Sequence, residues 1–322
     1  MDNPVGAGWS FTQDVRGFVR NEDDVARNLY SLLEQFFTVF DSLQTVDFYV
    51  AGESYAGHYV PAISHEIYVR NQRSPKVFIN LVGISIGDGS IDPQIQFAKM
   101  GDLWFRTGLA SVKEVQKVNE YERQFETAVR NKEYTRAFHI FDQLLNGDFW
   151  PYGTLFQNIT GLTNYFNFLE PNYPANPYPT YLNLPSTRAA IHVGACAYWD
   201  YNATVEFHLI PDWMTSVTHF LVPVMNNYKA LIYTGQLDII LGSAANEEYL
   251  QSINWNHAQE YRLSDKKVWY LNNNPNNPPL GYARSAGKFR QVVVRNAGHI
   301  LPQDQPVAAL DMITRFISNT PF

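Results

Sequence analysis

The sequence predicts an α/β fold in which a mostly parallel sheet is interrupted by a mainly helical insertion, and three observations predict it. Short β-branched and aromatic runs alternate with helical patterns near both ends of the chain, as they do in sheets with crossover helices. The run 77–86 is apolar on both faces, which is typical of a strand buried inside a parallel sheet. Between these groups, residues 111–146 have the apolar spacing of a charged helical pair.

A serine framed by small residues lies between the first predicted strand and the helix that follows it. Before this strand, apolar residues between Glu22 and Phe40 recur every three or four positions, which predicts an amphipathic helix. The run 47–51 is short, β-branched and aromatic and predicts a strand, whereas 55–69 has a helical pattern. Ser54 therefore stands in a sharp turn from strand to helix.

The rest of the chain divides into a helical insertion and a second group of strands. The predicted elements after residue 93 are helices at 111–130 and 132–146, strands at 229–234, 268–271 and 289–295, and a closing helix at 306–317. Residues 150–185 are rich in Pro, Asn and Tyr and show little periodicity. We therefore expect a first part of the core at 1–92, a helical cap at 93–222 and a second part of the core at 223–322.

Composition and charge exclude several classes of partner. The 322 residues include 24 basic and 31 acidic side chains, and no run of basic residues could neutralise a phosphate backbone. No apolar stretch reaches the roughly 18 to 20 residues needed to cross a bilayer. The histidines lack the spacing of a metal site. We therefore predict no nucleic acid, no membrane span, no metal and no cofactor, and the sequence leaves the oligomeric state undetermined.

Two sequons and the start of the chain bear on its location. Asn158 and Asn202 begin N-glycosylation sequons in polar, aromatic-rich stretches that we expect at the surface. Because chance sequons are common, they support secretion only weakly. The start, from Met1 to Gly6, has neither a charged n-region nor an apolar h-region, so no signal peptide is visible in this chain.

The turn at Ser54 has the composition of a nucleophile elbow. A serine hydroxyl of ordinary pKa needs a base, a group that orients this base, and donors for the oxyanion. In an elbow the serine lies in a strained strand-to-helix turn with small neighbours, and Gly52 and Ala56 flank Ser54 in this way. The same residues also suit a glycine-rich turn in which Ser54 caps the helix, so the turn alone leaves both interpretations open.

The order of a later acid and a later histidine favours the nucleophile. In α/β-hydrolases the serine is followed by an Asp or Glu and then by a His, each on a loop just after a strand. Asp238 is the first carboxylate after the strand at 229–234, and among the late histidines only His299 directly follows a strand. His257 lies in a polar, helical stretch and is interpreted as a surface residue. The predicted catalytic triad is therefore Ser54, Asp238 and His299.

Five blocks of the sequence resemble the signature blocks of the serine carboxypeptidases. They are Asp2–Ser10, Gly52–Pro61, Gly87–Pro93, Tyr233–Asp238 and Gly298–Pro306. The blocks come in order over the whole chain, which is most similar to the vitellogenic carboxypeptidase-like branch. The resemblance implies an α/β-hydrolase fold and a serine-type carboxypeptidase that releases C-terminal residues from peptides through an acyl-enzyme without a cofactor.

The resemblance also implies a role for each residue at the site. Ser54 would attack the last peptide bond, with His299 as base and then acid and Asp238 holding the required tautomer. The backbone N–H of Tyr55 would donate to the oxyanion. Glu53 would bind the free C-terminal carboxylate, which requires Glu53 to be protonated and implies activity at acidic pH. Family membership further implies peptide or protein C-termini as substrates, and a lysosomal, vacuolar or extracellular location for the full-length parent.

The chain also departs from the family pattern. Family members carry a signal peptide, the first core strands and an Asn-Gly-Gly-Pro-Gly segment upstream of the Asp2–Ser10 block, and this sequence contains none of them. That segment supplies the second oxyanion donor, and loss of one such donor costs about 10²- to 10³-fold in turnover. We therefore expect an N-terminally incomplete chain of low activity. Two alternatives stay open: an acyltransferase of the same fold, and an inactive copy that acts as a binding scaffold.

Overall fold

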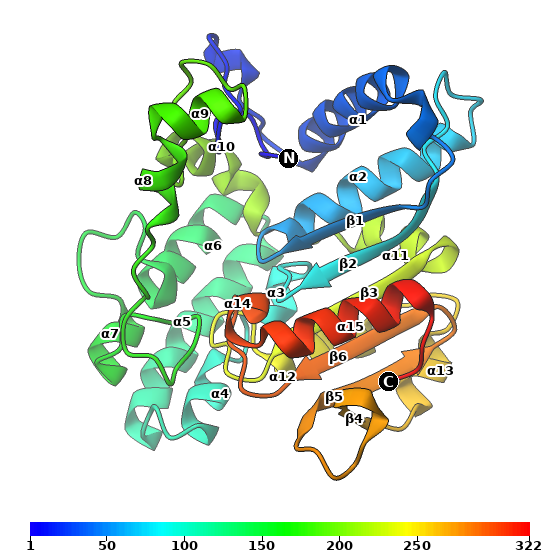
Figure 1. The fold of residues 1–322 in the computed structure, drawn as a ribbon. Coiled ribbons are helices and arrows are strands. Elements are labelled where there is room, and N and C mark those ends of the chain that lie inside the picture. Colours follow the sequence, from blue (N-terminus) through cyan, green and yellow to red (C-terminus); the bar gives the residue numbers. More distant parts are fainter.

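A six-stranded sheet in the order β1-β2-β3-β6-β5-β4 forms the centre of the computed structural model, which describes residues 1–322 (Figure 1). The strands are β1 (Phe48–Glu53), β2 (Leu81–Gly87), β3 (Lys229–Gly235), β4 (Lys267–Tyr270), β5 (Pro279–Ala286) and β6 (Phe289–Val294). Strands β1, β2, β3 and β6 are parallel, whereas β5 and β4 continue the sheet in antiparallel pairing. The sheet is therefore mostly parallel, as predicted.

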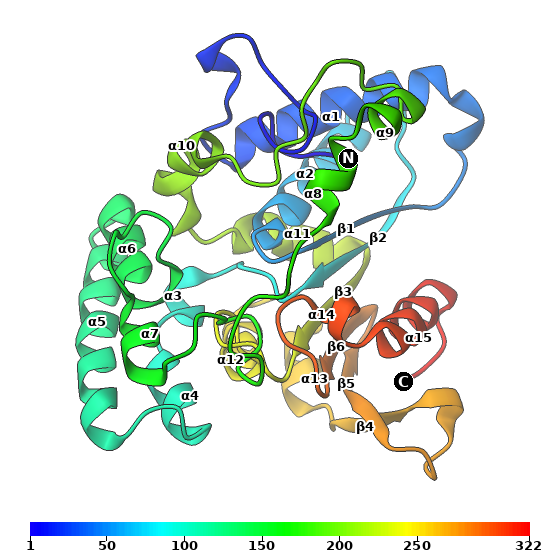
Figure 2. The ribbon, with the colours of Figure 1, turned by 60° about the vertical axis from the view of Figure 1, so that its left-hand side comes forward.

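Helices cover both faces of this sheet (Figures 1 and 2). One face packs against α2 (Ala56–Asn71), α11 (Thr218–Asn227), α12 (Ser243–Ser252) and α13 (Ala258–Leu263). The other face packs against α15 (Pro306–Ser318), which is the predicted closing helix. Because both faces are covered, the central strands are apolar throughout, and this explains why β2 lacks the alternation of a half-exposed strand.

Helix α1 (Glu22–Val39) packs on the outer side of α2 and forms as the apolar spacing predicts. The side-chain oxygen of Asn21 caps it by accepting a hydrogen bond from the N–H of Asp24 at 2.9 Å, and acids in the first turn complement the helix dipole. Its buried stripe, which includes Val25, packs against Ile63 of α2. Each side chain buried in this way contributes roughly 1.5 to 3 kcal/mol.

Between β2 and β3 the chain is mainly helical and has its own apolar core. Its helices before α11 are α3 (Pro93–Gln96), α4 (Met100–Arg106), α5 (Val112–Arg130), α6 (Tyr134–Phe141), α7 (Leu155–Thr160), α8 (Tyr178–Leu182), α9 (Pro185–Ala190) and α10 (Ala203–Trp213). Helix α6 continues into a π-helical turn that ends at Gly147, whose φ of 78° favours glycine. Trp104 and Phe138 are fully buried in this core. None of the helices in the structure combines the length and apolarity needed to cross a membrane.

Two strands differ from the sequence patterns. β2 begins at Leu81 rather than at Val77, because the side-chain amide of Asn71 binds both backbone groups of Ile79 and holds this stretch beside α2. β5 was not expected, since it begins with a proline and contains Gly281, and both residue types are unusual inside strands. Its antiparallel pairing with both neighbours supplies the backbone partners that offset these weak propensities.

Candidate active site

Ser54 lies in the turn between β1 and α2, at the carboxyl end of β1. Its φ of 63° is left-handed, a conformation that costs about 1 to 3 kcal/mol when the residue is not glycine. Three backbone hydrogen bonds hold it: the N–H of Ser54 donates to Gly87 at 2.9 Å, and its carbonyl accepts from Gly57 and Ser90 at 2.9 and 3.0 Å. Tyr55, not Ser54, occupies the N-cap position of α2. The turn thus has the strained geometry of an elbow and not that of a serine cap.

Small residues around Ser54 permit the close approach of β1, α2 and the loop after β2. A Cβ added to Gly52 would lie 2.5 Å from the Cβ of Ala56, and one added to Gly57 would lie 2.5 Å from the carbonyl oxygen of Ser90. Both distances are far inside van der Waals contact. A larger side chain at either glycine would therefore displace Ser54.

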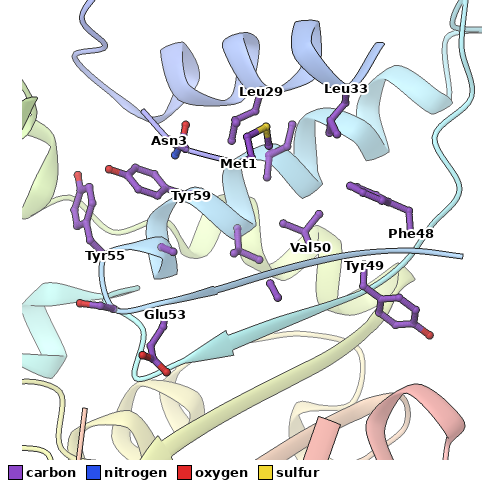
Figure 3. Close-up of a pocket in the computed structure, with 15 residues that line it drawn as sticks. Met1, Asn3, Leu29, Leu33, Phe48, Tyr49, Val50, Glu53, Tyr55 and Tyr59 are labelled. Carbon is purple, nitrogen blue, oxygen red and sulfur yellow. The ribbon is translucent and has the colours of Figure 1, made fainter. Parts of the chain in front are cut away.

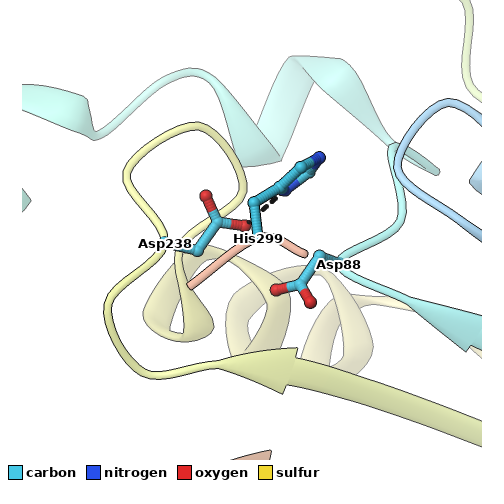
Figure 4. Close-up of side chains that lie close together, drawn as sticks. All are labelled: Asp88, Asp238 and His299. Atoms are coloured by element: carbon cyan, nitrogen blue, oxygen red, sulfur yellow. Dashed lines mark hydrogen bonds and ion pairs between the residues drawn. The ribbon is translucent and has the colours of Figure 1, made fainter. Parts of the chain in front are cut away.

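Asp238 and His299 lie on the loops after β3 and β6 and form a buried pair (Figure 4). Nδ1 of His299 is 2.8 Å from Oδ2 of Asp238, and both side chains are completely buried. Oδ1 of Asp238 accepts hydrogen bonds from the N–H groups of Ile240 and Leu241 at 2.9 and 3.2 Å. The carboxylate therefore fixes the ring and leaves Nε2 available, since Nε2 is buried and has no hydrogen-bond partner, Ser54 included.

A third carboxyl group, that of Asp88, belongs to the same buried cluster, and sequence reasoning missed it. Its Oδ1 accepts the N–H of Gly235 at 2.8 Å, and Asp88, Asp238 and His299 each place one polar atom within 4.8 Å of the others (Figure 4). Burial, and next the charge of Asp238, raise the pKa of Asp88 well above its ordinary value. Burial thus favours the protonated form of Asp88, and its otherwise unpartnered Oδ2 is placed to share a proton with Asp238. The available signal was that Asp88 is the first acid after β2.

A segment of the helical insertion, residues 165–168, bridges the loops that follow β3 and β6. The N–H of His299 donates to the carbonyl of Phe166 at 2.7 Å, and the N–H of Ile239 donates to the carbonyl of Tyr165 at 3.2 Å. The ring of Phe166 also stacks on the His299 imidazole with centroids 4.6 Å apart. The insertion therefore helps to position the histidine.

Glu53 ends β1 and is half-buried beside Ser54. Burial is the main cause that raises the pKa of Glu53 to about 7. His299 and the Tyr233 hydroxyl lower this pKa by smaller amounts, and the charge of Asp238 raises it slightly. The hydroxyl of Tyr233 donates to Oε2 of Glu53 at 3.4 Å. Below about pH 7, Glu53 is therefore mainly protonated and able to donate a hydrogen bond.

The ring of Tyr55 packs behind the turn rather than toward the acid and the histidine. It stacks on His58 with centroids 4.8 Å apart. The two ring nitrogens of His58 are 2.7 Å from the carbonyl oxygen of Ser90 and 3.2 Å from that of Thr215. Burial lowers the pKa of His58 to about 4, so this histidine is neutral and serves packing.

Two cavities meet at Ser54. An apolar cavity of about 540 Å³ runs along β1 beneath α1 and α2 (Figure 3). A second cavity, of about 480 Å³, lies toward the insertion and has the carboxyl groups of Asp148, Asp200 and Glu206 in its lining. Ser54 and Tyr55 line both cavities. Figure 3 shows the side chain of Glu53 on the opposite side of β1 from that of Tyr55.

The remaining predicted residues lie away from Asp238 and His299. Asn158 is exposed on α7, whereas Asn202 is half-buried, caps α10 and donates from Nδ2 to the carbonyl of Gly6 at 3.0 Å. The amide nitrogen of Asn158 likewise donates to the carbonyl of Gly153 at 3.0 Å, so exposure is what distinguishes the two sequons. His257 is exposed and pairs with Glu260 at 2.7 Å, which agrees with its interpretation as a surface residue.

Comparison with known proteins identifies close relatives of the whole chain. Residues 1–319 match the model of the serine carboxypeptidase family. The probable serine carboxypeptidase CPVL of Homo sapiens is 46% identical over 319 residues, which are 98% of this chain and 66% of the human protein. The venom serine carboxypeptidase of Apis mellifera is 41% identical and covers 100% of this chain and 68% of the bee protein. The vitellogenic carboxypeptidase of Aedes aegypti is 33% identical, with 98% and 66% covered.

The lengths of these matches and one solved structure establish the fold and the family of the chain. The chain spans 66% to 68% of the length of these three relatives. The crystal structure of Kex1, a prohormone-processing carboxypeptidase of Saccharomyces cerevisiae, superposes with a TM-score of 0.81 at 19% identity, covering 99% of this chain and 73% of Kex1. This likeness confirms the predicted α/β-hydrolase fold, and the sequence matches confirm the predicted resemblance. The chain belongs to the serine carboxypeptidase family.

Proposed function

We propose that the protein is a serine-type carboxypeptidase, a hydrolase that releases C-terminal residues from peptides through an acyl-enzyme. The observation that carries the proposal is the buried 2.8 Å contact between His299 and Asp238. These two residues lie on the loops after β6 and β3, and both strands are parallel to β1, which ends beside Ser54. Carboxyl ends of parallel strands meet at one edge of the sheet, where α/β enzymes place their chemistry.

In the proposed reaction, Nε2 of His299 takes the proton of the Ser54 hydroxyl as its oxygen bonds to the carbonyl carbon of the last peptide bond. The C–N bond then breaks, and the same proton passes from Nε2 to the leaving amine. Water repeats the sequence on the acyl-enzyme, so that Ser54 regains its proton. Asp238 stabilises the imidazolium in both halves, and the N–H of Tyr55 donates to the oxyanion.

Specificity for the end of a peptide is assigned to Glu53. A free C-terminal carboxylate is an acceptor at every pH of interest, so a neutral Glu53 attracts it by donating a hydrogen bond, whereas an ionised Glu53 repels it. The pKa of about 7 keeps Glu53 mainly neutral in acidic surroundings. This supports activity on the acidic side of neutral, and with it a lysosomal or extracellular site of action.

Glycosylation is proposed at Asn158. Its sequon is exposed on α7, and its side chain is accessible to a transferase after folding. Asn202 is the weaker acceptor because its side chain is half-buried, although the amide nitrogen of each asparagine donates to a backbone carbonyl at 3.0 Å. Intact-mass measurement before and after glycosidase treatment, on protein secreted from a eukaryotic host, tests this: retention of the mass shift in Asn158→Gln contradicts the assignment.

Active-site labelling tests the proposed nucleophile directly. A fluorophosphonate probe should label the protein once, and peptide mapping should place the adduct on Ser54. Ser54→Ala should abolish labelling, and His299→Gln should reduce its rate by several orders of magnitude, because the base is lost. His257→Gln removes an exposed histidine and serves as the matched control, with unchanged labelling.

Release of the C-terminal residue from a blocked dipeptide tests the reaction. We expect hydrolysis of the free-acid peptide and no labelling or hydrolysis after Ser54→Ala. Transfer of the acyl group to an added alcohol, at the expense of hydrolysis, would instead identify an acyltransferase. Labelling at another residue, or turnover that survives Ser54→Ala, would overturn the assignment of the nucleophile.

A further inference from the structure

We propose that the cavity of about 480 Å³ beside Ser54 binds a cationic side chain, that of lysine or arginine, on the residue that precedes the scissile bond. The inference rests on the proposed carboxypeptidase activity and names its preferred substrate. The cavity is lined by Ser54 and Tyr55 near the turn and by the carboxyl groups of Asp148, Asp200 and Glu206 from the insertion, and no lysine, arginine or histidine lines it. A side chain that enters beside Ser54 therefore meets carboxyl groups without a competing protein cation.

The position of Glu53 indicates which substrate residue enters this cavity. Glu53, the proposed partner of the C-terminal carboxylate, does not line it. Its side chain leaves β1 on the side opposite to that of Tyr55, which does (Figure 3). A peptide held with its terminal carboxylate at Glu53 and its last peptide bond at Ser54 therefore directs the preceding residue, on the acyl side, toward Tyr55 and the cavity.

Asp200 is exposed and accepts hydrogen bonds from Asn176 and Tyr178, whereas Asp148 and Glu206 are held by neutral partners and by a hydrogen bond to each other. Oε2 of Glu206 accepts from the hydroxyl of Tyr201 at 2.8 Å, whereas its Oε1 is buried with no hydrogen-bond partner beyond Asp148. Oδ2 of Asp148 accepts from Nδ2 of Asn146 at 2.8 Å, and the hydroxyl of Tyr165 orients this amide at 3.0 Å. The hydrogen bond between Asp148 and Glu206 requires one proton on the pair, and an ammonium or guanidinium group would replace this proton by donating to the carboxylates directly.

The electrostatics of the pair also favour a cation. Burial, and next the charge of Asp148, raise the pKa of Glu206 to about 7. The empty cavity therefore holds less than its full negative charge at acidic pH. A substrate cation offsets the repulsion between the two groups and permits both to ionise, which strengthens a charge-assisted contact.

The test compares peptides that differ only in charge at the penultimate position. The probes are N-blocked dipeptides with C-terminal leucine and with lysine, Nε-acetyl-lysine or glutamate before it. We expect kcat/KM for lysine to exceed that for acetyl-lysine by at least about 10-fold, since a hydrogen bond to a charged group is worth this much. In Asp148→Asn/Glu206→Gln the ratio should fall about 10-fold, whereas Glu120→Gln, an exposed acid on α5, should leave the ratio as in the parent.

Binding to a variant that cannot turn over separates this inference from the proposed function. In Ser54→Ala, calorimetry with the lysine and acetyl-lysine peptides should show the same preference, and the double carboxyl substitution should remove it. Equal affinity for the two peptides, or a lysine preference that survives the double substitution, overturns the inference even when the enzyme is active. If the unsubstituted protein cleaves none of the peptides but still binds the lysine peptide selectively, the proposed reaction is wrong and the assignment of the cavity stands.

Discussion

Replacing Glu53 by glutamine separates recognition of the C-terminus from the chemistry at Ser54. Glutamine keeps a hydrogen-bond donor at this position but cannot ionise, so it mimics the protonated acid at every pH. The parent has a Glu53 pKa of about 7, and only its neutral form is expected to bind a carboxylate. The neutral fraction falls about fivefold in the first pH unit above the pKa and about tenfold in the next, and kcat/KM for a free-acid peptide should fall with it.

The assay is kcat/KM from pH 5 to pH 9 for two substrates that share an acyl group. One is a blocked dipeptide with a free C-terminus, and the other is the methyl ester of the blocked acyl residue, which lacks the carboxylate. For the parent, we expect a decline of about fivefold between pH 7 and pH 8 with the peptide but not with the ester, as a single group of pKa about 7 requires. For Glu53→Gln, the peptide profile should lose this decline and follow the ester profile.

Two results would refute the reasoning. One is a peptide profile in Glu53→Gln that keeps the decline above pH 7, because the titrating group would then be another residue. The other is the same decline for the ester in the parent, because the effect would then belong to the chemical step. Glu120→Gln, which changes an exposed acid far from Ser54, is the matched control and should reproduce both parent profiles.

Two further predictions concern buried acidic residues, Asp88 and Glu22, that take no direct part in the proposed reaction. Asp88→Asn keeps a donor toward Asp238 and should retain most of kcat, whereas Asp88→Leu should lower it about 10- to 100-fold and shift the acid limb of the kcat profile, measured with the ester substrate. Glu22, only 3% exposed, has its pKa raised to about 9 by burial and by Asp212, so it is neutral when folded at pH 7 but ionised when unfolded. Glu22→Gln should therefore raise the free energy of unfolding by about 3 kcal/mol at pH 7 and leave it unchanged at pH 4, measured in urea.

The controls for these acids follow from the direction of each effect. For a carboxyl whose folded pKa is raised, the unfolded chain loses its proton first as pH rises, so the parent becomes less stable between about pH 4.5 and pH 9. A Glu22→Gln benefit that is equal at pH 4 and pH 7 would therefore contradict ionisation as its cause. For Asp88, equal loss in the Asn and Leu variants would indicate packing rather than a shared proton.

The sequence predicted the parallel part of the fold and the elements next to Ser54 because local pattern determines them. A strand buried on both faces has to be apolar throughout, and a tight elbow has to have small residues at Gly52 and Ala56. The positions of Asp238 and His299 could also be predicted from the sequence, since each residue lies shortly after a predicted strand. Antiparallel β5 was not, because its pairing with β4 and β6 overrides a weak local propensity that includes an initial proline.

The contacts that sequence reasoning missed join residues far apart in the chain. Asp88 touches the Asp238–His299 pair only because β2 and β3 are neighbours in the sheet, and no spacing in the sequence encodes this. Asp148 and Glu206 come together through the packing of the insertion, where periodicity is weak. Their chemistry is ordinary in isolation and becomes informative only beside Ser54.

The bridge at residues 165–168 limits how this protein can diversify. Its backbone carbonyls receive the N–H groups of Ile239 and His299, and Gly298 faces Phe166 so closely that a Cβ there would lie 2.2 Å from the Phe166 oxygen. Chimeras that exchange the insertion between relatives should therefore function only when this segment and the loop with Gly298 come from the same parent. Divergence of substrate preference is then expected to proceed by substitutions around the bridge, while its backbone path is inherited intact.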